Sequence, residues 1–203
     1  LSGDAFVTTW YDQSGNANNA TQATTTDQPK IVSAGTLVAG GLDFDGTNDY
    51  LTIGTKVVKP EANGNSVFAV RTAPTVANSA GVLSEQDSAA SSQFILGDAA
   101  AGTTLLWVNG TTFGTDATGT KLIGFDWDEA EFQAYIDGSA SGAAGAATVN
   151  ATGADVTTIG AHAVDSKTLF FNGQINEVIS YMFDNSANRV AIEANINAAY
   201  TIY

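Results

Sequence analysis

Residues 10–20 are Trp10-Tyr11-Asp12-Gln13-Ser14-Gly15-Asn16-Ala17-Asn18-Asn19-Ala20, or WYDQSGNANNA, and this stretch decides how the fold is interpreted. Two aromatic residues close an alternating run, and small polar residues follow. The side chains of Asp12 and Ser14 are of the kind that hydrogen-bond nearby backbone in turns, and Gly15 can adopt a positive φ. We interpret the stretch as a strand end followed by a turn over a sheet edge. A sugar-binding or metal-binding loop is the alternative.

Composition limits the classes of protein that fit. The chain has 203 residues and no cysteine, so a single domain over residues 1–203 is expected, without disulfides or thiolate metal sites. It has 7 Lys and Arg residues against 21 Asp and Glu residues, a net charge of −14. Because nucleic acids and anionic membranes bind clustered basic residues, which this chain lacks, we exclude both as partners.

The start of the chain and its apolar runs bear on location. No apolar run has the length of a membrane span. Leu1 opens a Ser-Gly-Asp sequence without an initiator methionine or a charged leader, which predicts a module cut from a longer protein. An extracellular, cell-surface or virion location is expected for such a module, although the lack of cysteine also fits a reducing cytoplasm.

Alternating apolar and polar residues dominate the chain and predict an all-β fold. Turn sequences such as Asp45-Gly46, Asn109-Gly110 and Asp137-Gly138 separate the runs and favour a sandwich or barrel. One helix is expected over residues 189–198, after the capping residues 185–188. The strand-like runs lie at 5–10, 42–44, 50–53, 66–71, 81–84, 93–96, 104–108, 121–127, 131–136, 156–159 and 175–183.

Three stretches carry a family resemblance: residues 10–20, 42–53 (LDFDGTNDYLTI) and 171–181 (FNGQINEVISY). They resemble the concanavalin A-like lectin/glucanase superfamily, which includes laminin-G domains. The resemblance implies a jelly-roll sandwich of two antiparallel sheets, here with one short C-terminal helix. The signature positions are Trp10, Asp12, Gly15, Asn16, Asp45, Gly46, Gly173 and Glu177.

The resemblance is less specific about function, because this superfamily includes lectins, adhesion domains, hydrolases, lyases and phage virion domains. The WYDQSGN segment is also similar to catalytic domains of the arabinofuranosidase B type. The active site of that family includes a cysteine pair, which this chain lacks, so we transfer no catalytic residue.

Acidic and basic side chains give no clear catalytic group. Hydrolysis of a glycoside needs two carboxylates across a cleft, and the residues from Asp126 to Glu131 favour a solvated acidic hairpin instead. For Glu177 the resemblance implies a structural role as an acceptor of hydrogen bonds, and catalysis or sugar binding is the alternative. His162 is the only histidine and supports neither a triad nor a transition-metal site.

Aromatic rings that stack on sugars, with amides that bind hydroxyls, predict a ligand site formed by Trp107, Asn109, Trp127, Gln133 and Tyr135. Oxygen donors near tight turns suit calcium, and the candidate ligands are Asp12, Asn16, Asp45 and Asp49. Bonding to their own backbone is the alternative for these four residues.

The resulting hypothesis is a non-catalytic carbohydrate-binding or adhesion module of a larger extracellular or phage virion protein, such as a tail fibre or capsid-associated protein. Its expected partners are a glycan or polysaccharide and neighbouring domains or subunits. A glycoside hydrolase or polysaccharide lyase of the same fold is the first alternative, and a purely structural virion decoration domain is the second.

Overall fold

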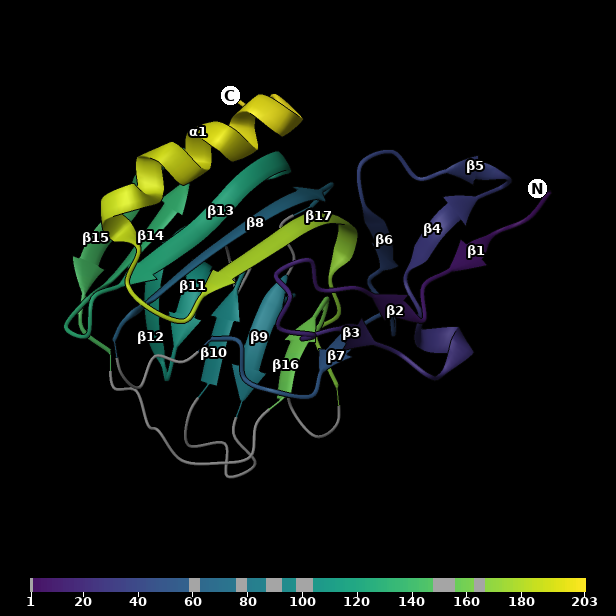
Figure 1. Cartoon of the computed structure of the whole chain (residues 1–203), viewed down its shortest axis with the longest axis horizontal. Coiled ribbons are helices and arrows are strands. Elements are labelled where there is room, and N and C mark those ends of the chain that lie inside the picture. Colours follow the sequence, from purple (N-terminus) through teal and green to yellow (C-terminus); the bar gives the residue numbers. More distant parts are fainter. Residues whose placement is uncertain are drawn as a thin grey trace.

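The computed structural model describes residues 2–58, 63–75, 80–86, 93–97, 104–147, 156–162 and 167–203. Two antiparallel sheets pack face to face, and one α-helix follows the last described strand (Figure 1). The predicted fold class, a sandwich with a C-terminal helix, is therefore confirmed. In each sheet, the inner face is the side that faces the other sheet, and the outer face is the opposite side.

Sheet A contains nine strands, of which β5 pairs only with β4. In spatial order they are β1 (Ala5–Phe6), β4 (Lys30–Ser33), β6 (Leu42–Asp45), β17 (Asn172–Tyr181), β8 (Asn65–Ala73), β13 (Gly119–Trp127), β14 (Phe132–Ile136) and β15 (Ser139–Gly145), with β5 (Thr36–Leu37) beside β4.

Sheet B contains eight strands. In spatial order they are β12 (Thr111–Thr115), β11 (Thr104–Val108), β10 (Gln93–Leu96), β9 (Leu83–Gln86), β16 (Val156–Ile159), β7 (Leu51–Ile53), β3 (Ala20–Thr21) and β2 (Thr9–Trp10). Two short 3-10 helices, η1 (Thr25–Asp27) and η2 (Ser186–Asn188), lie outside the sheets.

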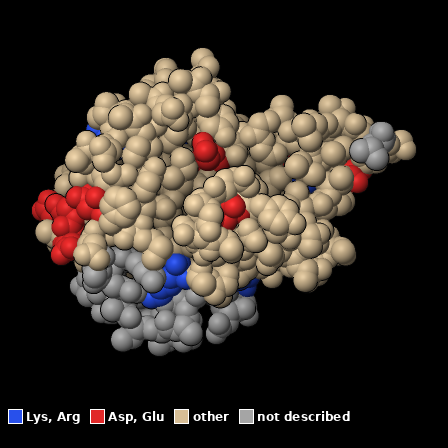
Figure 2. Space-filling view, viewed as in Figure 1, with Lys and Arg blue, Asp and Glu red and all other residues tan. Residues whose placement is uncertain are grey.

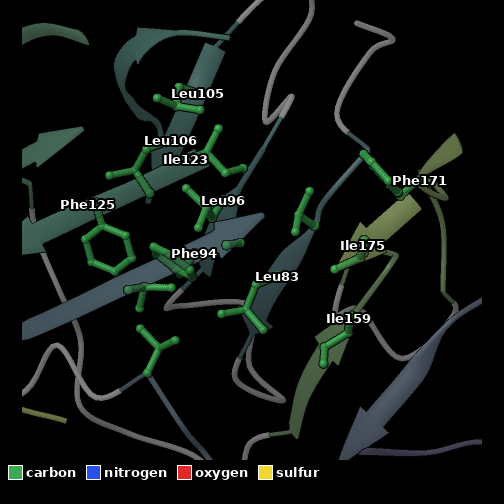
Figure 3. Packing of buried hydrophobic residues seen from close by; sticks show 14 of the residues in the cluster. Leu83, Phe94, Leu96, Leu105, Leu106, Ile123, Phe125, Ile159, Phe171 and Ile175 are labelled. Atoms are coloured by element: carbon green, nitrogen blue, oxygen red, sulfur yellow. The ribbon is translucent and has the colours of Figure 1, made fainter. Parts of the chain in front are cut away.

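The main core lies between the inner faces. Figure 3 shows Phe94 and Leu96 of sheet B near Ile123 and Phe125 of sheet A, and the rings of Phe94 and Phe125 have centroids 4.8 Å apart. Full burial of such a side chain contributes about 1.5–3 kcal/mol. This packing explains why the alternating pattern of the sequence forms a sandwich.

A second, smaller core lies under α1 (Arg189–Tyr200), which covers part of the outer face of sheet A (Figure 1). Phe68 and Val70 of β8 pack there with Ile196. The predicted helix is confirmed, and it continues to Tyr200. Among the described residues, no helix has the length and apolar character that crossing a membrane requires.

The stretch after β2 forms the predicted turn. The Asp12 carboxylate accepts hydrogen bonds from the backbone amides of Ser14 (2.8 Å) and Asn18 (2.9 Å), and these bonds lower its pKa. Gly15 has the expected positive φ, +87°. Hydrogen bonds from the backbone of the run to the Asp12 side chain therefore stabilise this turn.

Candidate functional site

The five predicted ligand residues do not line one surface. Trp107 lies between the core residues Leu106 and Val108 on β11, so its indole is on the outer face of sheet B, where it is partly exposed. Gln133 and Tyr135 lie on the outer face of sheet A, on the opposite side of the sandwich.

Trp127 requires a correction, because it lies in the core between the sheets and is only 6% exposed. Its ring therefore offers no face to a sugar. Tyr135 is partly exposed, but one face of its ring is occupied, since the Arg189 guanidinium carbon stands 4.0 Å from the ring centre. The Gln133 side-chain amide donates to the backbone carbonyl of Ala134 over 2.8 Å. Trp107 and Asn109 remain as candidates that share one part of the surface.

The strand registers place Trp107 in a row of directly opposed residues that crosses the outer face of sheet B. In spatial order the row is Thr112, Trp107, Ile95, Ser84, Thr158, Thr52, Thr21 and Thr9. Side chains that are directly opposite on neighbouring antiparallel strands share one face. This face therefore presents mainly hydroxyl groups, with one indole near the end formed by β11 and β12.

A bend crosses sheet B beside this row. Val82 and Leu83 are consecutive residues, yet both are fully buried in the core, so the regular alternation is interrupted there. Directly after the flanking strands β16 and β10, Gly160 and Gly97 have φ of +85° and +86°. The Gly160 amide donates to Val82 over 3.1 Å, and the Gly97 amide donates to Leu105 over 2.8 Å. These glycines let the paired strands turn together.

The outer face lies on the inside of this bend. The Ser84 hydroxyl donates to the backbone carbonyl of Ala161 over 2.6 Å. A Cβ atom added to Gly81 would lie 3.2 Å from Ile95 Cγ2. The chain beyond the bend therefore comes back toward the row, and Ile95, Ser84 and Thr158 are buried.

The two ends of the row are open. Thr112 and Thr21 are exposed, and Trp107 and Thr52 are partly exposed. Asn109 is partly exposed in the turn between β11 and β12, where its φ is +45°. None of the row's side chains is ionisable, so these eight residues can stack on a ring and bind hydroxyls but themselves supply no general acid or base.

The predicted acidic hairpin is present between β13 and β14. Asp128, Glu129 and Glu131 are exposed, and Figure 2 shows acidic side chains gathered on the left at this end of the sheet. The Asp128 carboxylate accepts hydrogen bonds from the amides of Ala130 (3.0 Å) and Glu131 (2.8 Å), which lower its pKa. This geometry is that of a solvated hairpin. Asp126 is separate from it and is buried on the outer face of sheet A.

Sequence reasoning missed Glu85, which lies on the inner face of sheet B. One carboxylate oxygen accepts hydrogen bonds from the amides of Val57 and Val58, both at 2.8 Å, and from the Thr157 hydroxyl at 2.5 Å. Burial raises the pKa of Glu85 to about 7. Glu85 lies two residues after the core residue Leu83, and this spacing was the available signal. The carboxylate fixes the chain that follows β7.

The four calcium candidates lie in two separate turns. Asp12 is bonded within its own turn, and Asn16 Nδ2 donates to Ser14 Oγ over 3.0 Å. Asp49 Oδ2 accepts from the Asp45 amide over 3.0 Å, and burial raises the pKa of Asp49 to about 6. Within the part of the chain that the structure describes, no three acidic, His or Cys side chains form a metal-binding group. The hydrogen bonds show these residues organising their turns, and calcium binding by them stays a prediction.

Glu177 and His162 take no part in the outer face of sheet B. The Glu177 carboxyl is hydrogen-bonded to Tyr200 of α1, and burial raises its pKa. His162 forms an isolated bridge with Thr168, and within the described part of the chain its buried Nε2 has no hydrogen-bond partner. Glu177 therefore ties the helix to sheet A.

No protein-family model and no curated protein matches the chain. Solved structures do match. Domain 4 of AbnA, an extracellular GH43 arabinanase from Geobacillus stearothermophilus in complex with arabinotriose, has a TM-score of 0.60 at 14% identity, over 96% of this chain and 82% of that one.

Two enzymes contain a similar region. A GH54 α-L-arabinofuranosidase has a TM-score of 0.63 at 14% identity, over 97% of this chain and 51% of that one. A Trypanosoma rangeli sialidase has a TM-score of 0.58 at 14% identity, over 97% and 32%. The chain thus spans about half of the first enzyme and a third of the second. At these identities the likeness shows a shared β-sandwich fold.

Proposed function

We propose that this chain is a non-catalytic carbohydrate-binding or adhesion module of a larger extracellular or phage virion protein. A sugar ring stacks on Trp107, and Asn109 and Thr112 bind its hydroxyls. The observation that carries this proposal is the partly exposed indole within a row of uncharged hydroxyl side chains on a bent sheet face. The fold shared with an arabinanase domain in complex with arabinotriose supports it.

Three buried carboxylates are occupied by structural contacts, which favours binding over hydrolysis. A glycoside hydrolase needs two carboxyl groups about 5–10 Å apart across an open site. Asp126 and Glu193 are buried and both pair with Arg189, whereas Glu85 bonds the backbone of Val57 and Val58. The experiment must separate a binding module from three alternatives, which are a hydrolase, a lyase and a structural decoration domain.

Binding to a glycan array, followed by calorimetry with arabinotriose and linear arabinan, tests the proposal. We expect a glycan to bind and Trp107→Ala to weaken it at least about tenfold, the equivalent of 1.4 kcal/mol. Gln133→Ala, on the opposite side of the sandwich, is the matched control and should bind normally. Circular dichroism checks that both variants fold.

Three results contradict the proposal. If folded Trp107→Ala binds the glycan as tightly as the original chain, Trp107 is not part of the binding site. If the bound glycan is cleaved, the enzyme alternative is favoured. The lack of any glycan ligand favours the structural domain.

A further inference from the structure

A buried charged cluster holds α1 on sheet A in addition to the apolar contacts. Arg189, the first residue of α1, forms an ion pair with Glu193 one turn later, and its Nε lies 3.9 Å from Asp126 Oδ2 on β13. The side chains of Asp126 and Glu193 are only 6% and 5% exposed. The guanidinium stacks on Tyr135 of β14. Two buried carboxylates therefore share one cation.

The charges of this cluster do not balance when both carboxyl groups are ionised. Asp126 Oδ1 accepts a hydrogen bond from the Ser66 hydroxyl over 2.6 Å, but Asp126 Oδ2 is buried and has no hydrogen-bond partner among the described residues. A single proton would neutralise the cluster and give it one more donor. Neighbouring buried carboxyl groups that lack a full complement of cations retain such a proton as a pair.

We propose that Asp126, Arg189 and Glu193 form a proton-sensitive clasp for α1. The clasp holds the helix most tightly when the two carboxyl groups share one proton, and it loosens when both are ionised. Ionisation leaves an uncompensated negative charge between α1 and the sheet, which weakens the contact at the first turn of the helix.

The direction of the pH effect follows from burial. Burial raises the pKa of Asp126 and of Glu193, so the folded cluster binds protons more strongly than the unfolded chain does. The stabilisation is therefore complete below the ordinary carboxyl pKa and is lost as the pH rises through the raised pKa values.

Other titratable groups around α1 are placed differently. Asp137 pairs with Lys121 at 2.6 Å. Asp184 acts on Asp126 through repulsion, which further favours proton retention. Burial raises the pKa of Tyr135 and of Tyr203, so both phenols stay neutral across the range of interest. At the other end of the helix, the Glu177 carboxyl is hydrogen-bonded to Tyr200 and adds an effect of the same sign, because burial raises its pKa too.

Amide hydrogen exchange of the full chain from about pH 4 to about pH 8, corrected for intrinsic exchange rates, tests the clasp. We expect the protection of α1 amides, relative to β8 amides, to fall over this range by up to about tenfold for each pKa unit of displacement. Asp126→Asn should flatten this dependence and retain high protection at the upper pH. Glu129→Gln in the exposed hairpin is the matched control and should keep the original profile.

Glu193→Gln is the second variant and should also flatten the pH dependence of α1 protection. It keeps the proposal testable if Asp126→Asn does not fold. Protection of α1 that does not change with pH in the original chain overturns the proposal. A pH dependence that both folded variants retain overturns it as well, because the titrating group then lies elsewhere.

Discussion

Trp127 and Phe132 face each other across the β13–β14 pair with their rings nearly parallel, 20° between planes and 5.6 Å between centroids. This contact closes the aromatic part of the core, because Phe132 also packs against Phe113 and Phe125. The stacked pair explains why an indole at the end of a strand is buried although charged residues follow it directly.

We expect Trp127→Ala to lower the free energy of unfolding by about 3–5 kcal/mol, since it leaves a large cavity in a packed aromatic cluster. Trp107→Ala removes a partly exposed ring and should lower it by less than about 1 kcal/mol. Urea unfolding of both variants measures the difference. Equal losses in the two variants would contradict the assignment of one indole to the core and the other to the surface.

These two tryptophans also show how far the sequence leads. Alternation correctly predicted strands around both, but it does not say which of two sides faces the other sheet. Strand pairing decides that, and here it puts Trp107 and Tyr135 on opposite sides of the sandwich. The laminin-G likeness and the roles of the signature residues remain predictions.

The packing of α1 on sheet A was only partly predictable from the sequence. The spacing of its apolar residues predicted the face that contains Ile196. Because α1 covers Phe68 on the outer face of sheet A, both sides of β8 are apolar. Glu193 on the same helix is buried as well. The local sequence does not reveal this burial, because it depends on contacts made in the folded protein. The Arg189 guanidinium lies over Tyr135 of β14, and Asp126 is 67 positions away from Glu193 in the chain.

Gly15 should be sensitive to substitution because of its φ of +87°, not because of crowding, since no atom lies within 4 Å of a Cβ added there. We expect Gly15→Ala to cost about 1–2 kcal/mol of unfolding free energy. Gly54→Ala is the matched control, because Gly54 also has open space but no positive φ, and it should be neutral or slightly stabilising. Thermal unfolding of both variants measures this. A folded Gly15→Ala protein should bind its ligand normally, and a selective loss of binding would revive the binding-loop interpretation.

Glu85 should make the stability of the whole sandwich depend on pH. Its pKa is raised by burial to about 7 in the folded protein, so the stabilisation is lost as the pH rises from the ordinary carboxyl range through neutrality. A displacement of this size corresponds to about 3 kcal/mol. Glu85→Gln keeps an oxygen acceptor for Val57 and Val58 and should flatten that part of the profile, as measured by urea unfolding at several pH values. Glu131→Gln, on the exposed hairpin, should leave the profile unchanged.

Arg71 and Asp116 form an ion pair between the sheets, with side chains that are 1% and 3% exposed. Among the described residues, Arg71 Nε is buried without a hydrogen-bond partner, and Asp116 is the only carboxylate that the Arg71 guanidinium bonds. We expect Asp116→Ala to lower the free energy of unfolding by about 3–5 kcal/mol, because it leaves a buried guanidinium uncompensated. Lys121→Ala breaks the partly exposed pair between Lys121 and Asp137 and should cost less than about 1 kcal/mol. Adding Arg71→Met to Asp116→Ala should restore much of the loss, since it removes the unpaired charge. Urea unfolding of the three proteins tests this, and a double variant no more stable than Asp116→Ala would show that the loss comes from packing at Asp116, not from the stranded charge.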